Sequence, residues 1–272
     1  MIAEFVVMFR ETLEAAFVVG IILAYLHKTK NTEHEKHVWS GVGAGIVLSL
    51  ILAYLFQFVQ GGFESHEEAF EGVFMVATSL LVTWFLIWIV NQKHIVKSLQ
   101  NEVKIALEKS TPFALFSVAF TSIAREGVES VLFMAGIFSS TGAVSVFGGL
   151  LGLAAAVVLG ILVFEYAVKF NISLFFTVTT VLLVLLAAGL FSQGIHELQE
   201  ARILPTFVEH IYDINPAVNS DGTFPLLHEK GTIGSIFKGL VGYDGDPSDL
   251  QVAGYLLYLI SFFSYWKFSN SK

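Results

Sequence analysis

The segment VVMFRETLEAAFVVGIILAYL, residues 6–26, is a long apolar run that contains three charged side chains, Arg10, Glu11 and Glu14. At about 3.6 residues per helical turn, Arg10 and Glu14 lie one turn apart on the same face, and Glu11 lies within the same arc of roughly 100°. A charged side chain at membrane depth costs at least about 2.5–3.5 kcal/mol. We therefore expect these three residues to face the interior of a helical bundle rather than lipid.

A second apolar segment repeats the pattern Arg-Glu-x-x-Glu. It is FSVAFTSIAREGVESVLFMAGIF, residues 116–138, with Arg125, Glu126 and Glu129. Together the two motifs carry four glutamates and two arginines, a formal charge of about -2 that a cation or protons must neutralise when it is buried. A purely structural ion pair needs one glutamate per arginine, so the excess of carboxylates favours a metal site.

Carboxylates are oxygen ligands that suit hard cations such as magnesium, calcium, manganese and ferric iron. We predict that the glutamates of both motifs bind the metal, with Glu14 and Glu129 doing more of this work. The arginines are expected to orient and hold the glutamates. The alternative is that each motif is a structural ion pair that locks the two helices together.

The composition is that of an integral membrane protein. Of 272 residues, 55% are hydrophobic and 14% are charged, and the mean hydropathy is +0.71. A soluble domain carries about 25% charged residues. The net charge of -8 argues against nucleic acid as a partner. The chain has no cysteine, which excludes thiolate metal sites, and only 4 methionines, which argues against a Cu(I) route.

Hydropathy predicts an all-α fold with about seven transmembrane helices in a single permease domain, residues 1–272. The predicted spans lie near residues 3–26, 38–59, 69–91, 112–138, 144–168, 172–194 and 251–268.

Basic residues are concentrated in alternate predicted loops and at the C-terminus. They are Lys28, Lys30, Lys36, Lys93, Lys97, Lys104, Lys109, Lys169, Lys267 and Lys272. The positive-inside rule then predicts that the N-terminus lies outside and the C-terminus in the cytoplasm. The 195–250 segment falls on the outside, where its prolines predict loops and short helices.

The recurrence of the motif in the first and fourth spans indicates an internal repeat. Repeat one covers about residues 1–91 and repeat two about 111–194, followed by the outer loop 195–250 and a last helix at 251–268. Three spans per repeat is an odd number, so the second copy enters the membrane in the opposite direction. Inverted repeats of this kind place transporter substrate sites near the midplane.

Acidic and histidine residues are also grouped at the predicted outer ends of the third and sixth spans. A lower-ranked outer metal site is predicted there, which would collect a cation before it enters the membrane. The alternative is a solvated acidic loop. The predicted outer ligands are Glu68, Glu71, His196, Glu197 and Glu200.

Paired Arg-Glu-x-x-Glu motifs in about seven spans resemble the oxidase-dependent iron permeases, which include the fungal high-affinity iron permeases and the bacterial EfeU type. The resemblance extends to HELQEA at 196–201, GYDGDPS at 242–248 and YLLYL at 255–259. It implies that the iron-binding residues are Glu11, Glu14, Glu126 and Glu129, with Arg10 and Arg125 beside them.

The resemblance also implies a function and a set of partners. These are high-affinity uptake of iron, as ferric ion made by an external ferroxidase or haem peroxidase, and a periplasmic or lipid-anchored iron-binding protein. It implies a bacterial cytoplasmic membrane, iron as the substrate, no tightly bound cofactor and no enzymatic activity. Two alternatives stay open: transport of another hard cation such as manganese, or cation/proton exchange. An intramembrane metal-dependent hydrolase is disfavoured because the histidines lie outside the spans or at their ends.

Overall fold

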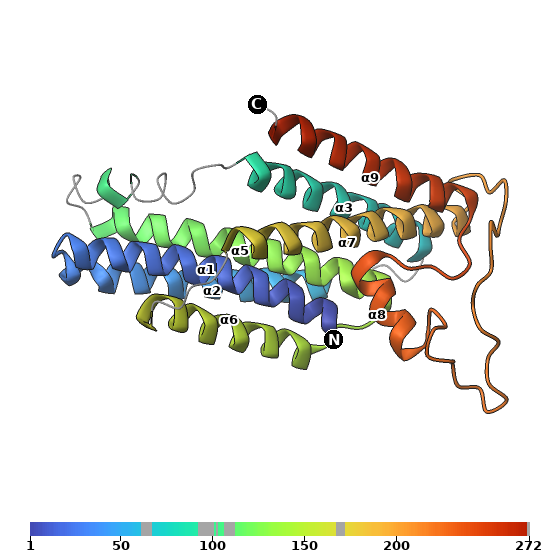
Figure 1. The fold of residues 1–272 in the computed structure, drawn as a ribbon, viewed down its shortest axis with the longest axis horizontal. Coiled ribbons are helices and arrows are strands. Elements are labelled where there is room, and N and C mark those ends of the chain that lie inside the picture. The colour runs from blue at the N-terminus through green and yellow to red at the C-terminus, as the bar shows by residue number, and fades with distance from the viewer. Residues whose placement is uncertain (61–66, 92–100, 102, 106–111, 167–171, 271–272) are drawn as a thin grey trace.

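The computed structural model describes residues 1–270 except 61–66, 92–100, 102, 106–111 and 167–171. The described residues form helices and loops without strands. Long helices run side by side along the length of the molecule (Figure 1). Their bounds are α1 Ile2–Lys28, α2 Glu35–Gln60, α3 Glu67–Asn91, α5 Pro112–Thr141, α6 Val146–Tyr166, α7 Ile172–Glu200 and α9 Asp249–Asn270; the shorter elements are η1 Thr32–His34 and α8 Thr232–Val241.

A long helix therefore corresponds to each of the predicted spans; in the fifth, predicted at 144–168, α6 begins at Val146, and residues 167 and 168 lie outside the described residues. Among the described residues, four helical segments are long and apolar enough to cross a membrane, by length and composition: Thr32–Phe56, Ala69–Ile87, Val146–Phe164 and Thr177–Glu200. The helices α1 and α5 each contain the three charged residues of a motif, which lowers their hydropathy. The helical fold class and its membrane character are confirmed, whereas the seven-span count and the orientation of the termini stay predictions.

The packing pairs the two predicted repeats in a reciprocal way. Helix α1 packs against α6, α2 packs against α5, and α3 packs against α7. Suppose that α1, α2 and α3 of repeat one correspond to α5, α6 and α7 of repeat two. A two-fold axis between the repeats then exchanges the α1–α6 pair with the α2–α5 pair and maps the α3–α7 pair onto itself. Helices α1 and α5 run in opposite directions (Figure 1), as an inverted repeat requires.

Small residues allow the reciprocal pairs to approach closely. A Cβ atom added to Gly41 of α2 would lie 2.5 Å from the carbonyl oxygen of Phe116 in α5. A Cβ atom added to Gly152 of α6 would lie 2.4 Å from the carbonyl oxygen of Phe5 in α1. These glycines are needed because any side chain would separate the helix backbones.

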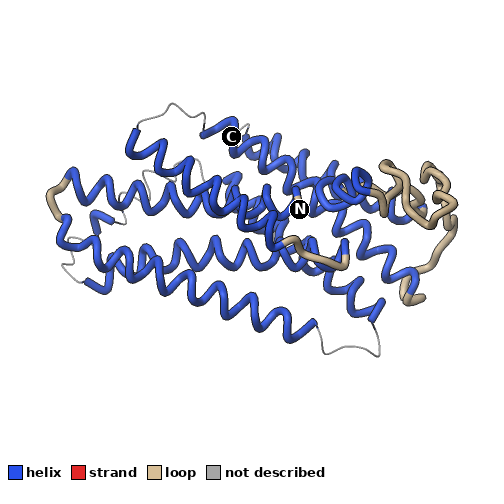
Figure 2. Tube along the Cα trace, turned by 90° about the horizontal axis from the view of Figure 1, so that it is seen from below, coloured by secondary structure: helices blue, strands red, loops and turns tan. Residues whose placement is uncertain are grey.

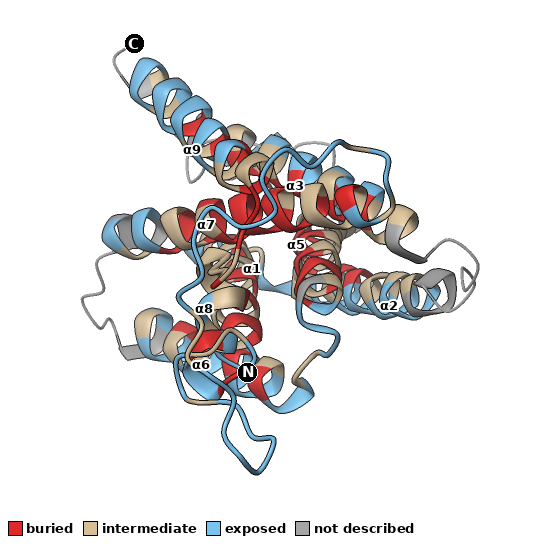
Figure 3. Cartoon of the chain, turned by 90° about the vertical axis from the view of Figure 1, so that its right-hand side faces the viewer, coloured by how far each residue is buried: buried red, intermediate tan, exposed pale blue. Residues whose placement is uncertain are grey.

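The buried residues line the centre of the bundle, while the outer faces of the helices are exposed (Figure 3). The largest apolar cluster involves α1, α3, α5, α7 and α9. The exposed faces of α2 and α6 are rich in large apolar side chains, such as Tyr54 and Leu150. A bundle with an apolar exterior and buried charges is the arrangement expected of a protein in lipid.

The segment between α7 and α9 lies at one end of the bundle, where most of the described loop residues gather (Figure 2). Helix α7 continues through Glu200, six residues beyond the predicted end of the sixth span at residue 194. The extension is supported by a contact one turn apart, with His196 Nε2 3.3 Å from Glu200 Oε1. The predicted short helix in this segment is α8, which packs on α7, α5 and α1.

Candidate metal centre

The first motif lies in the middle of α1, with its charged groups turned into the bundle. The Arg10 side chain is fully buried. Its Nη1 atom donates a hydrogen bond of 2.5 Å to Glu11 Oε1, and its Nη2 atom lies 2.7 Å from Glu14 Oε1. One guanidinium thus holds both glutamates of its own motif, as the one-turn spacing predicts.

The second motif repeats this arrangement in α5, but nearer to solvent. The Arg125 guanidinium donates two hydrogen bonds to Glu126 Oε1, one of them from Nε at 3.1 Å. The Nε atom also lies 3.5 Å from Glu129 Oε1. The Arg125 side chain is 30% exposed, whereas the Arg10 side chain is 0% exposed. The two motifs therefore differ in how fully their arginine is shielded.

Packing between α2 and α5 explains why the second motif contains a glycine. A Cβ atom added to Gly127 would lie 1.6 Å from the Ser49 hydroxyl oxygen of α2. The first motif has Thr12 at the corresponding position. The glycine therefore allows α2 to approach α5 at the level of the buried charges.

The carboxylates of the two motifs meet between α1 and α5. One oxygen each of Glu11, Glu126 and Glu129 lies within 4.8 Å of the others, and all three residues are buried. Among the described residues, Glu11 Oε2, Glu126 Oε2 and both oxygens of Glu129 have no hydrogen-bond partner. Buried polar atoms are normally satisfied. Three converging carboxylates with unsatisfied oxygens form a set of oxygen ligands suited to a hard cation.

Glu14 lies beside this cluster rather than within it. Its side chain is 11% exposed and it is ion-paired with Arg10. The structure thus groups Glu11, instead of Glu14, with Glu126 and Glu129.

A cavity of about 430 Å³ opens at the loop-rich end of the bundle. We call it the outer vestibule, after the predicted orientation that places the 195–250 segment outside. Its polar lining is dominated by carboxylates and histidines from the end of α7 and from the following loops. These residues are His196, Glu197, Glu200, Glu209, His210, Glu229, Asp244 and Asp246.

Three of the predicted outer ligands, His196, Glu197 and Glu200, line the outer vestibule. Glu71 is described but does not line the cavity, and the side chain of Glu68 lies outside the described residues. The prediction missed His210 and Asp246, whose side chains contact at 2.6 Å across the vestibule loops. Only the acidic GYDGDPS segment could have indicated this, because the contact joins residues far apart in the sequence.

A hydrogen-bond network fixes the GYDGDPS loop against α7 and α9. The Ser248 hydroxyl donates to Gln199 Oε1 at 2.7 Å, and the Ser248 backbone N–H donates to Gln251 Oε1 at 2.7 Å. Gln251 Nε2 in turn donates to Asp244 Oδ2 at 3.0 Å. Burial, followed by the negative charge of Asp244, raises the pKa of nearby Tyr212 above its usual value. The loop therefore presents fixed negative charge to the vestibule.

Sequence comparisons relate the chain to known proteins. The sequence profile described as the Iron permease FTR1 family matches residues 1–268. The chain is 32% identical over 265 residues to the "Ferrous iron permease EfeU" of Escherichia coli O6:K15:H31 (strain 536 / UPEC), covering 96% of this chain and 93% of the relative. It is 30% identical over 265 residues to the protein of the same name from Yersinia pestis, covering 96% and 91%.

No solved structure matches the chain. The profile covers nearly all of the sequence, and the relatives align over almost their whole length, with both motif helices inside the matched region. The protein is therefore a multi-pass membrane protein, and the chain belongs to the iron permease FTR1 family.

Proposed function

We propose that the protein takes up iron across the bacterial cytoplasmic membrane, and that the ion passes through the buried carboxylates of the two motifs. The observation that carries this proposal is the convergence of Glu11, Glu126 and Glu129 within 4.8 Å, with buried oxygens that have no hydrogen-bond partner among the described residues. Membership of the iron permease family supports iron as the transported ion.

The two arginines neutralise part of the negative charge of the cluster but do not provide hydrogen bonds to all of its carboxylate oxygens. Arg10 and Arg125 donate hydrogen bonds to Glu11 and Glu126. Among the described residues, both oxygens of Glu129 lack a hydrogen bond, although Arg125 Nε lies 3.5 Å from Glu129 Oε1. An excess of two negative charges in a low-dielectric interior favours a multivalent cation. Iron binding would replace the missing partners of the carboxylates and neutralise their charge.

The outer vestibule serves as the approach to this site. Its carboxylates raise the local concentration of cations by long-range attraction. We propose that His196, Glu197 and Glu200 share this role with His210 and Asp246, which lie on the same cavity.

The all-oxygen ligand set suits ferric iron, which fits a ferroxidase or haem peroxidase acting outside and a periplasmic or lipid-anchored protein that delivers the ion. The relatives' name, ferrous iron permease, refers to the ion in its reduced state. The ferric preference of the ligands and the ferrous name of the relatives are compatible if ferrous iron is oxidised outside before the ion enters the permease. It assigns transport and no catalysed reaction to this chain.

Iron binding by the purified protein tests the site. We expect X-ray absorption at the iron edge to show a shell of oxygen ligands in the wild type. Glu129→Gln and Glu126→Gln should each weaken binding by at least about tenfold, because each removes one charged ligand. Glu33→Gln is the matched control, since the Glu33 side chain is 80% exposed. Binding equal to wild type in both buried variants would contradict the proposed site.

The same measurement with manganese separates iron transport from transport of another hard cation. We expect iron to displace manganese from the wild type. A site that preferred manganese would overturn the assignment of iron while leaving the ligand residues in place.

A further inference from the structure

Helix α8 packs on α7, α5 and α1 at the loop-rich end of the bundle. A Cβ atom added to Gly239 would lie 3.7 Å from Ala3 Cβ in α1 and 3.7 Å from Thr141 Cγ2 in α5. Ala3 precedes Glu11 by eight residues, which corresponds to about 12 Å along a helix. Helix α8 thus lies against both helices that carry the motifs, about two turns from Glu11 along α1 and about three turns from Glu129 along α5.

Apolar side chains fill the space between α8 and the carboxylates. Val7 lies one turn outward from Glu11 in α1, and Phe133 and Ile137 lie one and two turns outward from Glu129 in α5. Val7 is 0% exposed, and Phe133 and Ile137 are each 2% exposed. A cation crossing this layer would lose its water without gaining ligands. The structure is therefore closed between the outer vestibule and the carboxylates.

Helix α8 docks through two buried glycines and through Leu240, which packs on the largest apolar cluster. Its two buried residues are Gly234 and Gly239. At its end, Gly242 adopts a left-handed conformation with φ of 70° and packs on Gly189 of α7, where an added Cβ atom would lie 2.2 Å from the Gly189 Cα atom. A helix of 10 residues whose only fully buried residues are two glycines separates from its neighbours at a lower cost in free energy than a long core helix does.

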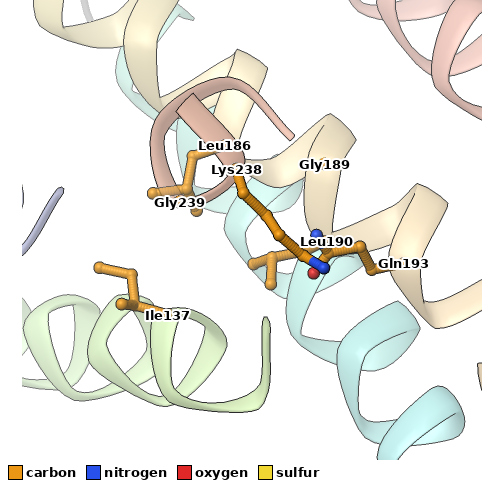
Figure 4. A pocket seen from close by; sticks show the side chains of 7 residues that line it. All are labelled: Ile137, Leu186, Gly189, Leu190, Gln193, Lys238 and Gly239. Carbon is orange, nitrogen blue, oxygen red and sulfur yellow. The ribbon is translucent and has the colours of Figure 1, made fainter. Parts of the chain in front are cut away.

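One lysine of α8 reaches into the cation route. Lys238 lines the outer vestibule and also the narrow space beneath α8, between Ile137, Leu190 and Gln193 (Figure 4). That space is too narrow for a water molecule. In Figure 4 the Lys238 side chain extends along α7 toward Gln193, whose buried Nε2 atom has no hydrogen-bond partner among the described residues.

Among the described residues that line the vestibule, Lys238 is the sole lysine or arginine. It forms no ion pair within 4.0 Å with any other described residue. The charge of Lys238 is therefore not used in a structural ion pair. Its charge instead offsets the field of six carboxylates, those of Glu197, Glu200, Glu209, Glu229, Asp244 and Asp246.

We propose that α8 is the outer gate of the transport route, and that Lys238 is a tethered cation that holds the gate closed until a metal ion replaces it in the vestibule. A multivalent cation competes for the same carboxylates more strongly than one ammonium group does. When the metal ion binds the vestibule carboxylates, these carboxylates no longer attract the Lys238 ammonium group. Helix α8 then moves away from the apolar layer. This inference rests on the proposed transport through the carboxylates of α1 and α5.

A disulfide between α8 and α1 tests the gate. The chain has no cysteine of its own, and the 3.7 Å separation of the Cβ positions at residues 3 and 239 suits a disulfide, for which Cβ atoms lie about 3.5–4.5 Å apart. We expect Ala3→Cys/Gly239→Cys to form the bond on mild oxidation, to lose iron uptake when oxidised, and to regain it after reduction. Each single-cysteine variant should transport iron under both conditions.

Failure of the disulfide to form would contradict the docked position of α8, and undiminished uptake by the oxidised variant would contradict the gate. Recovery on reduction distinguishes a locked gate from a failure of the carboxylate site, because the Glu126 and Glu129 side chains are unchanged throughout.

Lys238→Gln tests the role of the charge. Removing the competing cation should lower the KM for iron by about tenfold and should not lower the maximal uptake rate. Lys230→Gln, on the same outer segment but not on the vestibule lining, is the matched control with an unchanged KM. A purely structural role of Lys238 would lower the amount of folded protein and the maximal rate. An unchanged or raised KM would overturn the tethered-cation assignment.

Discussion

Substituting either motif arginine should lower the free energy of unfolding, and the loss should be larger for Arg10 than for Arg125. Arg10 is fully buried and lies 2.5 and 2.7 Å from two carboxylates. Arg10→Gln leaves Glu11 and Glu14 without their counterion in a dry interior, which costs about 3–5 kcal/mol for a broken buried pair. Arg125 is 30% exposed, so solvent screens the loss in Arg125→Gln, and the cost should be about 1.5–3 kcal/mol, as for hydrogen bonds to charged groups.

The assay is the free energy of unfolding of the purified protein in mixed micelles, followed by circular dichroism as a denaturing detergent is added. Iron must be removed first, because a bound ion stabilises the folded state by mass action. Arg10→Lys is a useful companion, since an ammonium keeps the charge but lacks the planar fork that reaches both glutamates. We expect it to recover part of the loss. An equal loss for both arginines, or a larger one for Arg125→Gln, would refute the argument from burial.

Two further predictions concern helix packing. Gly152→Leu should strongly reduce the amount of folded protein, because the Cβ atom alone would lie 2.4 Å from the Phe5 carbonyl oxygen. Gly43→Ala should be tolerated, because a Cβ atom there has no neighbour within 4 Å. Thermal aggregation of the solubilised protein measures both effects. Tyr258→Phe should destabilise the fold by about 1 kcal/mol by removing the hydrogen bond between the Tyr258 and Thr83 hydroxyls of α9 and α3, and denaturant unfolding that matches wild type would contradict it.

Most of the helices were predictable from the sequence because a membrane span has a length set by the bilayer and a composition set by lipid. The predicted first span, 3–26, falls within α1, Ile2–Lys28, and the fourth, 112–138, falls within α5, Pro112–Thr141. Helix α7 was underestimated because hydropathy falls at His196 and Glu197 although the backbone remains helical. A hydropathy analysis does not detect a polar extension of a helix beyond its apolar span.

The sequence indicated which charged residues share a helix face, but not how the carboxylates of the two helices are arranged. Helical spacing showed that Arg10 reaches Glu14, and the structure has that contact. Which glutamates of the two helices come closest depends on the rotation of α1 against α5, and the sequence carries no direct signal for that rotation. The grouping of Glu11 with Glu126 and Glu129 therefore required the structure.

The vestibule was the least predictable part. His210 and Asp246 meet through loop conformation, and Lys238 reaches the cavity because α8 docks on α7 through Gly189 and Gly242. No periodic pattern relates these positions. A close contact between two glycine backbones leaves little trace in a single sequence.

Uptake of labelled iron into proteoliposomes tests the central claim most directly. Wild type, Glu126→Gln, Glu129→Gln and the exposed control Glu33→Gln would be reconstituted to equal amounts of folded protein. We predict that both buried variants lose at least about tenfold in uptake while the control matches wild type. Uptake at the wild-type rate by Glu126→Gln and Glu129→Gln would show that the buried carboxylates are structural, and would contradict transport of iron through this site.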